Sequence, residues 1–230
     1  PPPPPTADLS VYQGYLRGSA PTNGYDAHYA WSRPGGNGSR ARIIDIEYQW
    51  TVDHEDLLLA PTNILYGTQY TAFGPDHGTA SLGILMARSN SYGVAGMAHA
   101  ARVDLVSSCD AGGSWLPANA INQAAALTGP GDIILLEQQA YNYALTNYCP
   151  LEFMPDVYSA IVNATALGRI VIEPAGNGYF DLDGAAWSNM FQRATRDSGA
   201  IMVRAGQATD RARRDFSCYG SRVDIQGWGE

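Results

Sequence analysis

Pro75-Asp76-His77-Gly78-Thr79-Ala80-Ser81-Leu82-Gly83-Ile84-Leu85-Met86-Ala87 is a small, apolar stretch that follows a loop of glycine and proline. Apolar residues recur at helical spacing in its second half, so we expect a buried helix with His77 in the first turn. Asp76 stands where an N-cap belongs, and Gly78 leaves that turn slim enough for close packing. The alternative interpretation is a capped core helix with an incidental histidine.

Apolar runs alternate with helical patterns along the rest of the chain. We expect strands at residues 42–47, 101–107, 132–136, 170–172, 200–204 and 222–225, and further helices at residues 119–127 and 156–167. Continuous apolar strands that alternate with helices indicate a parallel sheet covered on both faces. The predicted fold class is therefore α/β, a three-layer α/β/α architecture with a mostly parallel central sheet.

The ends of the chain differ in composition. Residues 1–40 begin with five prolines and continue with tyrosines, so we expect a proline-rich N-terminal arm and a segment packed on the surface of the domain formed by residues 41–230. The chain has 230 residues, a formal net charge of −8 and no lysine, which argues against nucleic acid as a partner. No apolar run approaches the ~18 residues that a membrane span needs, so no membrane partner is expected.

Three cysteines permit one disulfide with one thiol left over. Cys109 and Cys149 each follow a predicted strand at the same edge of the sheet, so we expect these two to pair. The alternative is three free thiols.

Polar residues stand at the ends of the predicted strands. Asp45, Glu137 and Asn177 lie at or just past strand ends, and the carboxyl ends of parallel strands share one edge of a sheet. Asp45 can therefore lie beside His77. A carboxylate beside a histidine is two-thirds of an acyl-transfer triad, in which the carboxylate orients the imidazole and the histidine is the base. The amide of Asn177 can donate a hydrogen bond to a developing oxyanion.

Five blocks then follow one another in a fixed order. They are Ile43-Ile44-Asp45 with the turn at residues 53–57, residues 76–80, residues 93–98, residues 174–177, and residues 215–225. In this order the chain resembles the subtilisin-like serine proteases, the subtilases, whose blocks for the catalytic aspartate, the histidine and the oxyanion asparagine these are. The resemblance implies a secreted serine endopeptidase in which Asp45 orients His77, His77 is the general base and Asn177 is the oxyanion donor.

The chain departs from the family at the nucleophile. The family's Gly-Thr-Ser block does not occur in these 230 residues, and family spacing places it past Glu230. We expect the serine beyond residue 230, in the continuing chain or in the protein's own C-terminal fragment. The alternative function is that of a non-catalytic module, a subtilase-like fragment or pseudoenzyme that binds polypeptide. A nucleotide-binding Rossmann fold also suits the architecture, but no strand is followed by Gly-x-Gly-x-x-Gly.

Further departures fall near the expected cleft. Glu137, Gln138 and Gln139 replace the family's Ser-Leu-Gly on the substrate-flanking strand, so we expect Glu137 and Gln138, with Gly176, to bind substrate. Glu47 replaces a glycine after the catalytic aspartate, and Glu173 replaces a small residue before the oxyanion block. Glu47, Glu137 and Glu173 together predict a carboxylate cluster that favours basic side chains; the alternative is that one or two of them point outward.

The resemblance also implies a calcium loop and a place outside the cell. Its ligands would be the side chains of Asp56 and Asn90 and the backbone oxygens of Arg88, Tyr92 and Val94, five of the six to eight oxygens that calcium takes. The alternative is an ordinary loop held by hydrogen bonds of Asn90. Glycosylation sequons at Asn37 and Asn163 agree with secretion.

Overall fold

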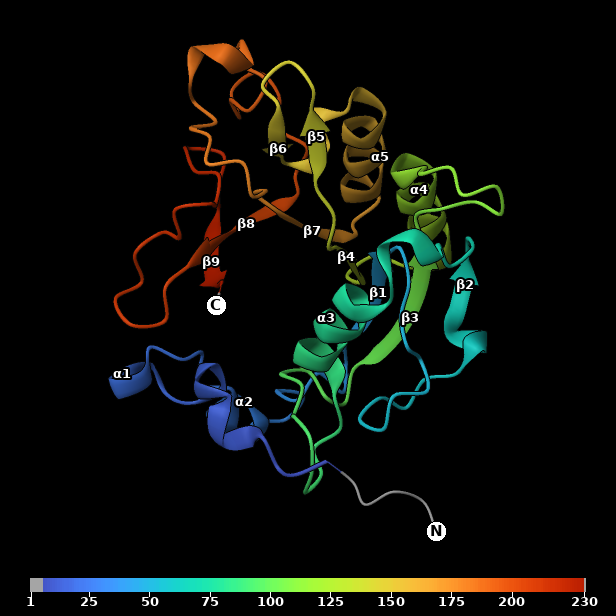
Figure 1. Ribbon diagram of the computed structural model, residues 1–230, viewed down its shortest axis with the longest axis vertical. Helices are drawn as coiled ribbons and strands as arrows, with labels where there is room; N and C mark the ends of the chain where they lie inside the picture. Colours follow the sequence, from blue (N-terminus) through green and yellow to red (C-terminus); the bar gives the residue numbers. More distant parts are fainter. Residues whose placement is uncertain (1–5, 230) are drawn as a thin grey trace.

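A seven-stranded sheet forms the centre of the molecule (Figure 1). The computed structural model describes residues 6–229, so the five N-terminal prolines of the predicted arm lie outside the described residues. The strand order is β2-β3-β1-β4-β7-β8-β9, and every pair in it is parallel. The strands are β1 (Arg42–Glu47), β2 (Ile64–Tyr66), β3 (Arg102–Ser107), β4 (Ile133–Leu136), β7 (Ile170–Pro174), β8 (Ile201–Gly206) and β9 (Ile225–Trp228).

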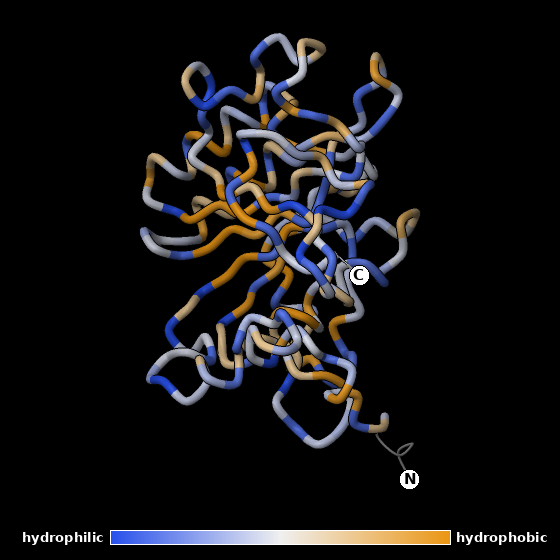
Figure 2. Tube along the Cα trace, turned by 90° about the vertical axis from the view of Figure 1, so that its left-hand side faces the viewer, coloured by the Kyte–Doolittle hydropathy of each residue, from blue (hydrophilic) through white to orange (hydrophobic). Residues whose placement is uncertain are grey.

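Helices cover both faces of this sheet. α4 (Pro117–Leu127) and α5 (Pro155–Ala166) pack on one face, and α3 (Asp76–Met86) packs on the other (Figure 1). Two apolar clusters result, one on each side, and the strands are the most hydrophobic part of the chain trace in Figure 2. The predicted three-layer α/β/α fold is therefore confirmed. Within residues 6–229, no helix is long and apolar enough to cross a membrane.

The central strand β1 shows how the sheet positions its polar residues. Ile44 and Ile46 point toward α4 and α5, while Ile43 packs in the cluster beneath α3. Because side chains alternate along a strand, Asp45 and Glu47 lie on the same face as Ile43. The strand is hydrogen-bonded to β3 on one side and β4 on the other, so both carboxylates are buried.

The N-terminal segment packs on the domain near the last strand. The backbone N–H of Trp228 in β9 donates to the hydroxyl of Tyr25 at 2.6 Å, and the indole of Trp228 donates to the carbonyl of Asn23 at 3.1 Å. The amide of Gln13 exchanges two hydrogen bonds of 2.8 Å with the backbone of Ala95. This segment contains η1 (Ser10–Tyr12), η2 (Gly14–Leu16), α1 (Ser19–Thr22) and α2 (Ala27–Trp31).

The remaining elements are short. A hairpin of β5 (Ala140–Asn142) and β6 (Asn147–Cys149) forms a second, antiparallel sheet after β4. The other 3-10 turns are η3 (Pro61–Asn63), η4 (Thr71–Phe73), η5 (Leu151–Phe153) and η6 (Ala185–Trp187). The hairpin was not predicted, because each strand has only three residues and carries polar side chains.

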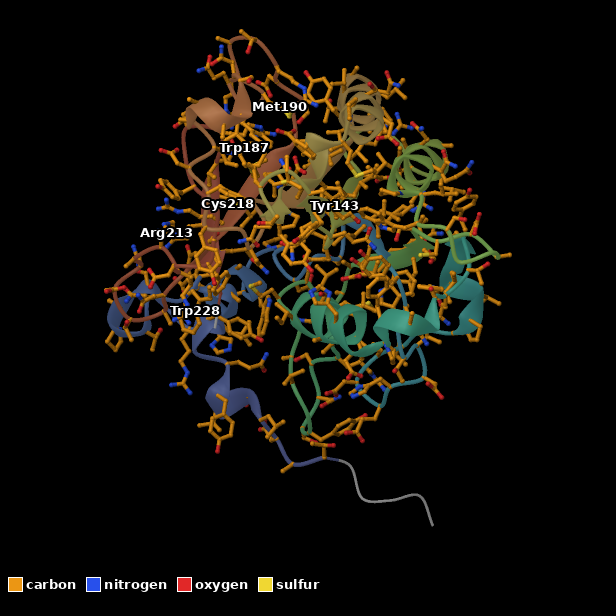
Figure 3. All side chains as sticks on the ribbon, turned by 45° about the horizontal axis from the view of Figure 1, so that its top comes forward. Tyr143, Trp187, Met190, Arg213, Cys218 and Trp228 are labelled. Atoms are coloured by element: carbon orange, nitrogen blue, oxygen red, sulfur yellow. The ribbon has the colours of Figure 1, made fainter. Side chains whose placement is uncertain are left out.

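The predicted disulfide is wrong. All three cysteines are free thiols, and each is buried. Cys149 and Cys218 belong to the cluster beneath α4 and α5, together with Trp187; Cys218 and Trp187 are labelled in Figure 3. The ring of Trp187 packs edge to face on three phenylalanines, Phe153, Phe180 and Phe191. Burial raises the pKa of the Cys149 thiol to about 12, so it behaves as an apolar core group.

Candidate active site

The first turn of α3 presents His77 at the edge of the sheet. A Cβ on Gly78 would meet the carbonyl oxygen of Gln49 and come within 2.8 Å of the Trp50 ring, so only glycine allows this turn to pack so closely. The side chain of His77, at the preceding position, is 67% exposed. The helix begins at Asp76 after Pro75 and has no side-chain cap, so the predicted N-cap role of Asp76 is wrong.

The carboxylate that contacts the histidine is not the predicted one. Nδ1 of His77 pairs with Oε1 of Glu47. Asp45, which we expected to orient His77, instead accepts a hydrogen bond of 2.7 Å from the indole N–H of Trp50. The physical reason is reach: Asp45 lies one strand repeat deeper than Glu47 and carries a shorter side chain. Asp45 still lies close enough for its charge to act on His77.

Burial controls the protonation of the groups around His77. Burial, then the charges of Glu47 and Glu137, raise the pKa of Asp45 well above its usual range. The hydrogen bond of His77 to the carboxylate of Glu47 raises the pKa of His77, against the effect of burial. Burial and the charge of Glu47 raise the pKa of Glu137 to about 7. The site therefore gathers protonatable groups with shifted pKa values, which is typical of catalytic centres.

One cleft of about 710 Å³ joins these groups to the predicted oxyanion donor. His77, Glu47, Glu137 and Asn177 all line it, so the structure brings together four residues from β1, α3 and the segments after β4 and β7. Its remaining walls are largely aromatic and come from Tyr48, Phe73, Trp115, Tyr141, Tyr143 and Tyr148. Such a concave site with a few convergent polar groups is the expected form of a binding cleft.

The loop after β7 places Asn177 at the cleft. Gly176 has φ of +88°, and a Cβ there would come within 2.8 Å of the backbone of Cys149. The loop can therefore lie against β6, with Asn177 exposed next to it. The backbone N–H of Asn177 donates to Oε1 of Gln139 at 2.8 Å. The side-chain amide of Asn177 makes no hydrogen bond among residues 6–229.

Two predicted substrate residues have different environments. Glu137 lies in the cleft, and its carboxylate makes no hydrogen bond or ion pair with the part of the chain that the structure describes. Gln138 is only 3% exposed; its amide donates to Ser108 at 2.6 Å and accepts from the Trp115 indole at 3.1 Å. Gln138 therefore holds the wall of the cleft, and its role toward substrate stays a prediction.

The predicted carboxylate cluster contains two glutamates rather than three. Glu47 and Glu137 lie at the cleft, but Glu173 points to the opposite face of the sheet, where it lies 3.8 Å from the guanidinium of Arg222. Glu173 alternates with Ile172 on β7, so its side chain faces α5. The part of the prediction that placed Glu173 at the cleft is wrong.

The residues of the predicted calcium loop hydrogen-bond to one another. One oxygen of Asp56 accepts from the amide of Asn90 at 3.0 Å, and the other accepts from the N–H of Val94 at 2.9 Å. The side-chain oxygen of Asn90 accepts from the N–H of Tyr92, and the N–H of Arg88 donates to the carbonyl of Asp56. Each side-chain oxygen of the predicted ligand set thus accepts one hydrogen bond within the loop. This arrangement agrees with the alternative of a hydrogen-bonded loop, and the calcium site stays a prediction.

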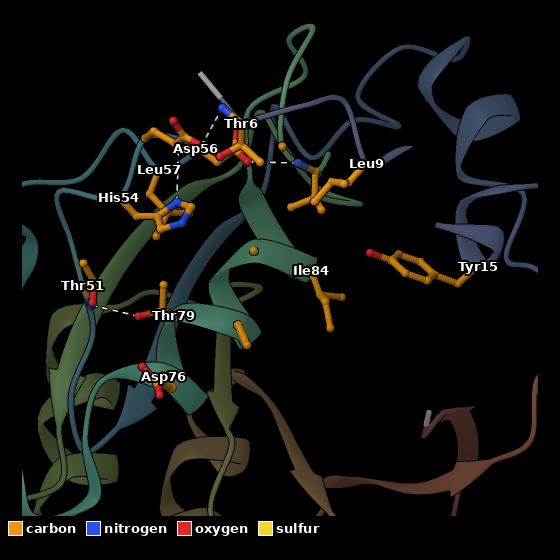
Figure 4. Close-up of a pocket in the computed structure, with 15 residues that line it drawn as sticks. Thr6, Leu9, Tyr15, Thr51, His54, Asp56, Leu57, Asp76, Thr79 and Ile84 are labelled. Carbon is orange, nitrogen blue, oxygen red and sulfur yellow. Dashed lines mark hydrogen bonds between the residues drawn. The ribbon is translucent and has the colours of Figure 1, made fainter. Parts of the chain in front are cut away.

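Asp56 lines a second cavity, of about 560 Å³, between α3 and the N-terminal segment (Figure 4). Thr6, Leu9 and Tyr15 approach from the N-terminal side, and Ile84 from α3. His77 does not line this cavity. The cavity and the cleft have no lining residue in common.

The aromatic hairpin beside the cleft was missed in the sequence. Tyr141 in β5 stands opposite Tyr148 in β6, with ring centroids 5.2 Å apart, and Tyr143 packs on Tyr141 at 5.1 Å. Tyr143 is 85% exposed and is labelled in Figure 3. The alternation of tyrosines after Gln139 is a signal that could have predicted this wall.

The raised pKa of Glu137 predicts how stability depends on pH. In the unfolded chain this carboxyl titrates at 4.5, and in the folded chain its pKa is about 7. The folded state therefore keeps its proton longer, so the free energy of unfolding falls as pH rises from 4.5 to 7. At ~1.4 kcal/mol for each pH unit, the fall is about 3 kcal/mol.

We expect Glu137→Gln to remove this fall. The free energy of unfolding of the variant, relative to that of the natural chain, should therefore rise by about 3 kcal/mol between about pH 4.5 and about pH 8. Urea denaturation of both proteins at the two pH values measures the difference. An identical pH dependence in the two proteins would contradict the burial of a titrating Glu137.

No protein-family model matches the chain, and no curated protein matches it. Solved structures do match. A protease of Pseudoalteromonas arctica has a TM-score of 0.67 at 20% identity, over 98% of this chain and 72% of that one. The epidermin leader peptide processing serine protease EpiP of Staphylococcus aureus has a TM-score of 0.62 at 17% identity, over 97% and 59%. The psychrophilic subtilisin-like protease Apa1 of Pseudoalteromonas sp. AS-11 has 0.60 at 19%, over 89% and 45%.

These three similarities cover nearly the whole of this chain but between 45% and 72% of the proteases it matches. At such low identity, a similarity of structure shows the fold and not the activity. Together with the parallel sheet and its helices on both faces, it identifies the architecture: the chain has the fold of the subtilisin-like serine proteases.

Proposed function

We propose that this chain is the part of a secreted, subtilisin-like serine endopeptidase that carries the general base and the oxyanion donor. The observation that supports this most directly is the single cleft in which His77, buried carboxylates and Asn177 meet. The attacking serine would come from a segment after residue 230 or from the protein's own C-terminal fragment. The substrate would be a polypeptide.

In this mechanism His77 moves the proton. Its Nε2 takes the proton of the serine hydroxyl as the oxygen attacks the peptide carbonyl, and the buried carboxylates of β1 stabilise the resulting imidazolium. The side-chain amide of Asn177 donates a hydrogen bond to the oxyanion of the tetrahedral intermediate. His77 then returns the proton to the leaving amine, and water repeats the sequence on the acyl-enzyme.

An open groove on the sheet offers space for the segment that would carry the serine. This groove, of about 430 Å³, lies on the α3 face of the sheet and is lined by Ile84 of α3 and by Ile172 and Val203 of the strands. Gly176 and Asn177 line the same groove. A segment that covers its apolar walls would therefore reach the oxyanion loop, where the serine is needed.

The proposal is tested by labelling the active preparation with a fluorophosphonate serine probe, followed by mass spectrometry of the labelled peptide. A label on a serine in a Gly-Thr-Ser context, in chain that follows residue 230, would support it. A preparation that stays unlabelled but binds peptides in the cleft would overturn it. The binding alternative would then hold, since Glu137 and the tyrosine hairpin would still offer a surface for a polypeptide.

Replacing Asn177 with alanine tests the oxyanion donor. We expect kcat to fall by about 10²–10³-fold, a magnitude that comes from subtilisin itself, while KM changes little. Kinetics on a peptide substrate with the serine-bearing protein measures the split. Asn119→Ala is the matched control, because Asn119 is exposed on α4 across the sheet. Equal losses in both variants would contradict the assignment.

A further inference from the structure

β1 offers two carboxylates to the face that carries His77. Asp45 and Glu47 are two residues apart, so both side chains point toward α3, and they are 0% and 1% exposed. Buried carboxylates need partners, and the two have found different ones. Which of them is bound to the imidazole decides which one sets its tautomer.

Glu47 is fixed against His77. Its Oε1 contacts Nδ1 of His77, and its Oε2 accepts a hydrogen bond of 3.1 Å from the backbone N–H of Tyr48. Both oxygens therefore have a partner. Nε2 of His77 makes no hydrogen bond within residues 6–229, so the ring is held by one nitrogen and free at the other.

Asp45 is committed elsewhere. Its Oδ2 accepts the indole N–H of Trp50, a residue 2% exposed that belongs to the core beneath α3. Its Oδ1 is buried and has no hydrogen-bond partner in the described part of the chain. The glycine at position 78 lets Trp50 reach this place, so the turn that presents His77 also directs Trp50 to Asp45.

We propose that Glu47, rather than Asp45, is the positioning residue that orients His77 and keeps its proton on Nδ1. The inference deepens the proposed function, on which it rests for the role of His77 as a base. With the proton on Nδ1, the lone pair of Nε2 is the one available to accept a proton. Asp45 then serves as the acceptor that anchors Trp50 beneath the pair.

The charges around His77 agree with this assignment. Three carboxyl groups act on it: Glu47 and Asp45 from β1, and Glu137 from the segment after β4. Burial raises the pKa of Asp45 well above its usual range, which disfavours the charged form of this carboxyl. Glu47 is the carboxyl group in direct contact with the ring, and its hydrogen bond is the largest of the effects that raise the pKa of His77.

The test is an NMR titration of this chain, which needs no serine. Long-range ¹H–¹⁵N spectra separate the four histidines and give the tautomer and the titration midpoint of His77, assigned by its absence in His77→Gln. In Glu47→Gln we expect the midpoint to fall by about one to three pH units and the Nδ1–H tautomer to lose its dominance. In Asp45→Asn, which keeps an acceptor for Trp50, we expect a much smaller fall in the midpoint and no change of tautomer.

The Trp50 indole N–H signal reports whether the packing survives. It should keep its position in Glu47→Gln. If Glu47→Gln does not fold, Glu47→Asp replaces it, since withdrawal of the carboxylate by one methylene should also lower the midpoint of His77. An unchanged midpoint in the folded Glu47 variant, or a fall in Asp45→Asn alone, would overturn the inference.

These outcomes are separable from those of the proposed function. A serine label together with dependence of His77 on Asp45 would remove the role of Glu47 and leave the protease intact. Dependence on Glu47 in a protein that takes no serine label would do the reverse.

Discussion

Replacing His77 with alanine is expected to lower kcat of the serine-bearing protein by about 10⁶-fold, a magnitude that comes from subtilisin itself. The reason is that His77 is the proposed general base: a buried carboxylate contacts its Nδ1, and its Nε2 is free to take the proton of the serine hydroxyl. Steady-state kinetics on a peptide substrate measures the loss, and circular dichroism establishes that the variant is folded.

His54→Ala is the matched control for this variant. His54 is exposed, lines the separate cavity between α3 and the N-terminal segment, and accepts a local hydrogen bond from the backbone of Asp56. We expect this variant to keep most of its activity. Comparable losses in His77→Ala and His54→Ala would contradict the location of the active site.

Replacing Arg222 with methionine is expected to lower the free energy of unfolding by about 3–5 kcal/mol. Arg222 is fully buried, and its guanidinium donates to both oxygens of Glu152, at 2.8 and 3.0 Å. Glu152 is fully buried too, so the substitution leaves a carboxylate without its counter-charge on the α5 side of the sheet. Urea denaturation followed by tryptophan fluorescence measures the change.

Arg102→Met is the control for the Arg222 variant. Arg102 also pairs with a carboxylate, Asp104 at 3.2 Å, but its side chain is 67% exposed. Exposed pairs contribute at most about 1 kcal/mol, so this variant should be nearly as stable as the natural chain. If the two variants lose equal stability, the buried network is not what holds the C-terminal strands.

Most of the fold could be predicted because strands buried on both faces have continuous apolar sequences. Residues 42–47 and the apolar runs that follow them form parallel strands where expected. The last strand was placed three residues too early, at 222–225, whereas β9 begins at Ile225. Arg222 and Val223 are not part of β9, because Arg222 forms the buried ion pair with Glu152 and the N–H of Val223 closes a turn on the carbonyl of Gly220.

The candidate site could be predicted only to the level of its neighbourhood. The sequence places His77, Asp45 and Asn177 at one edge of the sheet, and His77 and Asn177 line one cleft in the structure. Whether Asp45 or Glu47 contacts His77 depends on Trp50, whose indole N–H is hydrogen-bonded to Asp45. No local sequence pattern predicts that hydrogen bond. The direction in which Glu173 points could not be predicted, because β7 has apolar residues on both faces and its sequence therefore does not show which face is which.

The parallel order of the sheet has a consequence for how the protein is made. Glu47 at the end of β1 stands opposite Ser107 of β3, and β1 also pairs with β4, so each contact closes a long loop of chain. Such distant pairings are slow to form, because the entropy of loop closure is lost before the contacts compensate for it. The walls of the cleft come from segments that range from Glu47 to Asn177. During synthesis, therefore, His77 leaves the ribosome long before the cleft residues up to Asn177 have been made. A nascent chain then exposes the histidine without a cleft that could bind a polypeptide.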